Sequence, residues 1–121
     1  MDEATAKRLL DAYLACAEIR AFAQGNDFDR YEADRALRLI IERLLEIVGE
    51  ALRMARALDP DLKRSIPEID RIIATRHHIA HGYDSISNET IWVIVERRIE
   101  GLQARLRVLL IENGYRRELP D

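Results

Sequence analysis

Apolar residues recur at steps of three and four positions through nearly the whole chain, and this helical period restricts the fold more than any other feature. The pattern predicts four main helices, over residues 2–23, 28–57, 67–82 and 88–113. Turn-forming residues are few, since the chain has five glycines and three prolines, which argues against a β-sandwich or barrel. We therefore expect an all-α fold, an antiparallel bundle of four or five helices joined by short connections.

Glycine and proline residues interrupt the helical pattern at a few positions. Gly25 stops the first helix, and Pro60, which lies between two aspartates, ends the second. The second helix is long, so we expect a kink near Gly49. The charged tail 115–121 is expected to fray. With 121 residues and no linker or internal repeat, the chain is predicted to form a single domain, 1–121.

Composition and charge argue against several classes of protein. We interpret the single Cys16 as a small core residue of a protein in the reducing cytoplasm. No segment has the ~18 uncharged apolar residues that span a bilayer, so we expect no membrane association. The net charge of −3, from 19 basic and 22 acidic residues, argues against a basic coat for tight, non-specific nucleic-acid binding. A local basic cleft remains compatible with that charge.

All three histidines lie within five residues, in the segment RHHIAHGYD at positions 76–84. Arginine binds phosphate and stabilises negative charge that develops on it. Histidine exchanges a proton near neutral pH. Together these side chains suffice for cleavage of RNA without a metal or other cofactor, with the 2′-hydroxyl attacking the neighbouring phosphate. A two-fold dimer would bring two such sets together if its interface passes through this segment.

The spacing sets a condition on this chemistry. Arg76 and His81 are five positions apart, which places them about 140° apart around an ideal helix. They can converge if His81 lies at or beyond the end of the helix, where Gly82 permits a bend.

The segment resembles the active-site signature of HEPN-domain ribonucleases, which is an arginine, a polar residue and a histidine, here Arg76, His77 and His81. Tyr83, two positions after the histidine, resembles the HepT branch, the toxin half of MntA–HepT modules. The resemblance covers roughly residues 5–112. Three further segments carry it, IVGEA at 47–51, IPEI at 66–69 and IWVIV at 91–95.

The resemblance implies a HEPN-like helical bundle that acts as a homodimeric endoribonuclease toxin and needs no metal. Arg76 and His81 would be catalytic, and His77 would support them. A nucleotidyltransferase antitoxin like MntA would silence the toxin by attaching AMP to Tyr83 and could form a higher assembly with it. Two positions depart from the branch. Asn is common where His77 stands, and the aromatic residue often found after Ile-Pro is absent.

Other interpretations of the same residues stay open. Arg76 and His81 could be helix-terminal cations that bind carbonyls or a carboxylate. His77 and His81, an i,i+4 pair, could bind zinc together with Asp84. Tyr83 could be a packed ring, His78 a solvent-facing or dimer-contact residue, and Trp92 a core or interface residue. Glu50 lies in an apolar stripe and needs a partner, for which Arg76 is our hypothesis.

The alternative function is a non-catalytic helical dimer. It would bind a nucleotide or a protein partner, with the Arg/His cluster as a phosphate-binding patch.

Overall fold

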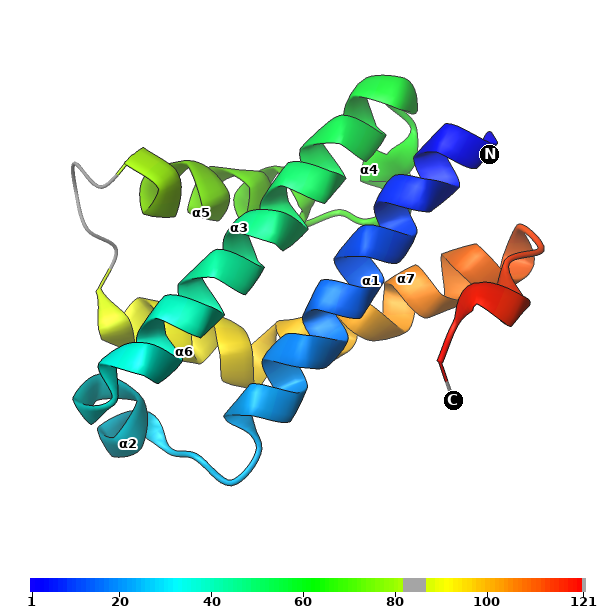
Figure 1. The fold of residues 1–121 in the computed structure, drawn as a ribbon. Helices are drawn as coiled ribbons and strands as arrows, with labels where there is room; N and C mark the ends of the chain where they lie inside the picture. The colour runs from blue at the N-terminus through cyan, green and yellow to red at the C-terminus, as the bar shows by residue number, and fades with distance from the viewer. Residues whose placement is uncertain (82–86, 121) are drawn as a thin grey trace.

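The computed structural model of the chain describes residues 1–81 and 87–120, without the side chains of Ala80 and His81. This part is all-α and contains no strand, as the apolar period predicts. It forms seven α-helices and a short 3-10 helix (Figure 1): α1 (Glu3–Ala23), α2 (Phe28–Ala33), α3 (Arg35–Leu58), α4 (Leu62–Ser65), α5 (Ile69–His81), α6 (Asn88–Arg97), α7 (Ile99–Glu112) and η1 (Arg116–Glu118).

Two of the four predicted helices are each divided in two, which raises the number of helices above the four or five expected. The first break is at Asp34, whose backbone leaves the helical region at φ −104° and ψ 98°. Its carboxylate accepts a hydrogen bond of 3.1 Å from the backbone N–H of Leu37 and so caps the start of α3. The second break is at Arg98, between α6 and α7.

α3 runs without a break from Arg35 to Leu58, so Gly49 does not interrupt the helix. The third predicted helix begins two residues later than Pro67, which lies with Glu68 in a turn before α5. The tail predicted to fray contains η1, and Leu119, 9% exposed, packs with the core.

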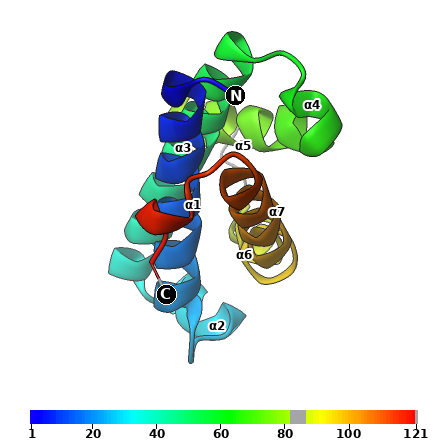
Figure 2. The same ribbon diagram turned by 90° about the vertical axis from the view of Figure 1, so that its right-hand side faces the viewer.

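The centre of the fold is the antiparallel pair of α1 and α3 (Figure 1), and α5 packs on α3 while α7 packs on α1. Figure 2 shows α6 and α7 together on one side of the central pair. Burial of apolar side chains between these helices is the main source of stability. The fully buried ones include Leu9, Ile19, Ile41, Leu52, Ile91, Leu102 and Leu106.

Cys16, interpreted as a core residue, and Trp92, interpreted as a core or interface residue, both lie in the core. Cys16 is fully buried, and this burial raises the pKa of its thiol to about 12. Trp92 is 4% exposed and stacks on Tyr31 of α2, with ring centroids 5.1 Å apart. Within residues 1–81 and 87–120, each helix is too short or too polar to cross a membrane.

Candidate functional site

Arg76 occupies a position in the inward-facing stripe of α5. Ile69 is fully buried, and Ile72, Ile73 and Ile79 pack partly buried against the core. Arg76 follows Ile72 by one helical turn, so it continues this stripe, and its side chain is 29% exposed. The guanidinium is therefore held at the edge of the helix interface and still reaches solvent.

Gly49 allows α5 to approach α3 closely at this point. A Cβ atom at Gly49 would overlap the Cβ of Arg76 and would lie 2.8 Å from its Cγ and 3.4 Å from the backbone oxygen of Ile72. The first two carbons of the Arg76 side chain thus fill the space above the glycine. This contact explains a glycine within a continuous helix, where it costs about 1 kcal/mol relative to alanine.

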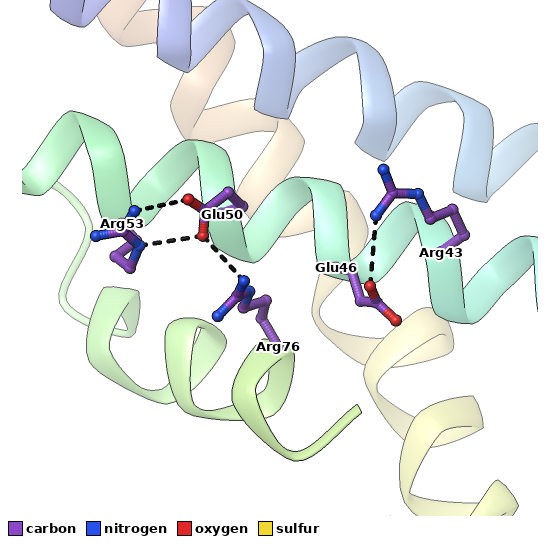
Figure 3. Close-up of polar contacts among 5 residues, drawn as sticks. All are labelled: Arg43, Glu46, Glu50, Arg53 and Arg76. Carbon is purple, nitrogen blue, oxygen red and sulfur yellow. Dashed lines mark hydrogen bonds and ion pairs between the residues drawn. The ribbon is translucent and has the colours of Figure 1, made fainter. Parts of the chain in front are cut away.

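Glu50 is the carboxylate that pairs with Arg76, as the sequence hypothesis proposed. Its Oε2 lies 3.4 Å from Nη2 of Arg76, so the ion pair joins α3 to α5 (Figure 3). Glu50 also accepts two hydrogen bonds from Arg53, 2.7 Å from Nη2 and 3.0 Å from Nε. The hydrogen bonds from Arg53 hold the pKa of Glu50 below its ordinary value, and the positive charges of Arg53 and Arg76 lower it further.

Arg53 is a partner that the sequence analysis missed. The signal was present, because Glu50 and Arg53 are three positions apart on one helix, a spacing at which opposite charges pair. In turn, the hydrogen bond from Arg53 to Glu50 raises the pKa of Arg53 above its ordinary value.

Arg76 and Glu50 line a surface hollow of about 370 Å³. Its other charged side chains come from α1 and α3, and the whole hollow combines three arginines with four carboxylates. Leu14, Ile47 and Met54 add apolar surface to its lining. The charged residues of the hollow are Arg8, Asp11, Glu18, Arg43, Glu46, Glu50 and Arg76.

The structure describes the side chains of two of the three histidines, His77 and His78. His77 and His78 are exposed, with their rings edge to face and 6.2 Å between centroids. His81 is the last described residue of α5, and its side chain lies outside the described residues. Tyr83 and Asp84 also lie outside them. Among the side chains that the structure describes, no group of three His, Cys, Asp or Glu residues could hold a metal ion.

Comparison with known proteins gives two matches to the chain. The model of a family described as "Ribonuclease HepT-like" matches residues 13–109. A curated protein of Methanocaldococcus jannaschii, named "Putative RNase MJ1380", is 21% identical over 103 residues, which cover 84% of this chain and 92% of that protein. No solved structure matches.

Proposed function

Because the chain belongs to the HepT-like ribonuclease family, we propose that it is a metal-independent endoribonuclease toxin with its chemistry at Arg76 and His81. One observation supports this most directly. Arg76 is a partly buried arginine whose side chain is packed at its root, paired at its tip and open to a surface hollow. An arginine held in this way is suited to bind a phosphodiester and to stabilise charge on it.

In the proposed reaction, the 2′-hydroxyl oxygen attacks the adjacent phosphorus and the bond from phosphorus to the 5′-oxygen breaks. A base takes the proton of the 2′-hydroxyl, and an acid gives a proton to the leaving 5′-oxygen. His81 would serve as the base or the acid, His77 would support the site, and Arg76 would neutralise the phosphate. No cofactor enters this scheme.

The active form would be a homodimer in which the partner subunit completes the site. The family resemblance supports this, and a two-fold axis that passes near α5 would bring the Arg/His sets of the two subunits together.

Regulation would act at Tyr83. We infer that a nucleotidyltransferase antitoxin similar to MntA attaches AMP to its hydroxyl, and the family resemblance supports this assignment. Each AMP unit would add bulk and a negative charge seven positions after Arg76. RNA would then be repelled from the site and sterically excluded.

A second candidate function is the non-catalytic dimer that binds a nucleotide or protein partner. The excess of carboxylates over arginines in the hollow favours a protein partner for that surface.

Cleavage of mixed cellular RNA in excess EDTA separates the two functions. The toxin proposal expects the parent protein to cleave RNA, and Arg76→Ala and His81→Ala to lose cleavage while remaining folded. Arg71→Ala removes an exposed arginine from the same helix and is the matched control, expected to keep activity. Parent protein without AMP that cleaves no RNA would favour the binding dimer.

A further inference from the structure

The side chain of Arg76 is constrained at both of its ends. Its Cβ and Cγ fill the space above Gly49, so the root of the side chain has little freedom. Its Nη2 pairs with Oε2 of Glu50 at 3.4 Å, so the guanidinium points from α5 toward α3 (Figure 3), where Arg76 and Glu50 both line the hollow. Gly49 imposes the first constraint and Glu50 the second, and these two residues are consecutive in α3.

Glu50 is itself held in a fixed orientation by Arg53. Two hydrogen bonds, of 2.7 and 3.0 Å, join its two carboxylate oxygens to the Arg53 guanidinium in a fork-to-fork arrangement. Oε2 therefore serves both arginines. The Glu50 and Arg76 side chains are 35% and 29% exposed, and ion pairs with this exposure contribute little to stability. The arrangement is better suited to fixing a direction than to stabilising the fold.

We propose that Glu50 is a positioning residue that holds the Arg76 guanidinium ready for the scissile phosphate. This inference rests on the proposed ribonuclease function. Arginine loses considerable rotamer freedom when it is fixed, and Glu50 fixes it before RNA arrives. Glu50 and RNA need not compete, because a guanidinium has five N–H donors and Glu50 contacts Arg76 through one nitrogen.

The same helix offers a matched control. Glu46 pairs with Arg43 at 3.4 Å, three positions apart as in the Glu50–Arg53 pair, and both residues line the same hollow (Figure 3). Glu46→Gln and Glu50→Gln each remove one negative charge from the hollow without changing side-chain length. A general effect of charge on RNA binding would appear in both variants, whereas a loss of positioning would appear in Glu50→Gln.

The first measurement is the kinetics of RNA cleavage. We expect Glu50→Gln to lower kcat by about 10- to 100-fold, with KM within about twofold, because the guanidinium is less well placed in the transition state. Glu46→Gln should stay within about twofold of the parent in both constants. Glu50→Asp keeps the charge and should recover part of kcat. Equal kcat in the two glutamine variants would overturn the proposal.

The second measurement does not require activity. The ¹⁵N relaxation of the Arg76 Nε, with its signal identified by its loss in Arg76→Lys, reports how rigid this side chain is. The order parameter should fall in Glu50→Gln and stay at the parent value in Glu46→Gln. An unchanged order parameter in Glu50→Gln would overturn the proposal even if cleavage falls. A parent protein that cleaves no RNA would instead overturn the proposed function, while the order parameter still decides whether Glu50 holds Arg76.

Discussion

Gly49 and Arg76 meet where α3 and α5 cross, and there is no room for a methyl group between them. The glycine and the arginine therefore form one packing unit that joins the two helices.

We expect Gly49→Ala to destabilise the protein by about 1–3 kcal/mol, the usual cost of overpacking. Alanine is the better helix former, so helix propensity alone would stabilise the variant by about 1 kcal/mol. The measurement is urea unfolding followed by the fluorescence of Trp92, the single tryptophan. Gly101→Ala on α7 is the control, since a Cβ there meets no atom within 4 Å, and it should be stabilising.

Asp34→Ala should destabilise the protein by about 1 kcal/mol, because it removes the side-chain acceptor at the start of α3. Asp34→Ser keeps a capping oxygen and should retain most of the stability. Thermal unfolding followed by circular dichroism compares the three proteins. If both substitutions lowered the melting temperature equally, the side-chain cap would not be the cause.

Stability should depend weakly on pH through Glu50, because its ion pair with Arg76 is partly exposed. Its folded-state pKa lies below the ordinary value of 4.5, so its stabilising effect is present above that pH and is lost as the pH falls below it. The difference in unfolding free energy between the parent and Glu50→Gln should therefore shrink as the pH is lowered from about 6 toward 3. Urea titrations at several pH values measure it. Added salt should also reduce the difference, since the pair is partly exposed. A difference that grows at low pH would contradict the assignment.

Cys16 should be unreactive in the folded protein. Its side chain is fully buried and its thiol pKa is raised to about 12, so both access and the thiolate fraction are low. We expect iodoacetamide or a disulfide reagent to modify it slowly under native conditions and rapidly in denaturant. Rapid native labelling at pH 8 would show that this part of the core opens readily.

The helical pattern predicts the main elements because burial follows the 3.6-residue period closely along α1, α3 and α7. The break at Asp34 was missed although the sequence carries a signal for it, since Asp34 and Arg35, three and four positions after the buried Tyr31, are polar and exposed, and the Asp34 carboxylate caps the new helix. The role of Gly49 was not predicted from the sequence. A glycine in a helix indicates either flexibility or close packing, and the packing depends on the distant Arg76.

The candidate site, too, could be predicted only in part from the sequence. The clustered histidines and Arg76 stand out in the sequence, and the pairing of Glu50 with Arg76 could be anticipated from a carboxylate in an apolar stripe. The sequence does not show that Arg53 would share that carboxylate, because many i,i+3 charge pairs form on helices without any role at a site. The roles of His77, His81 and Tyr83 stay predictions.

The packing of Arg76 against Gly49 affects how variation at these positions should be interpreted. Selection for a folded protein alone would preserve Gly49 and, at position 76, any side chain that supplies a Cβ and a Cγ to fill the helix crossing. An arginine that stays invariant among relatives, where other side chains would fill the same space, would therefore point to a role for its charge. The informative variants are those that keep the two carbons and lose the charge, such as Arg76→Gln. Relatives that carry glutamine there would be expected to keep the fold and to lack RNA cleavage.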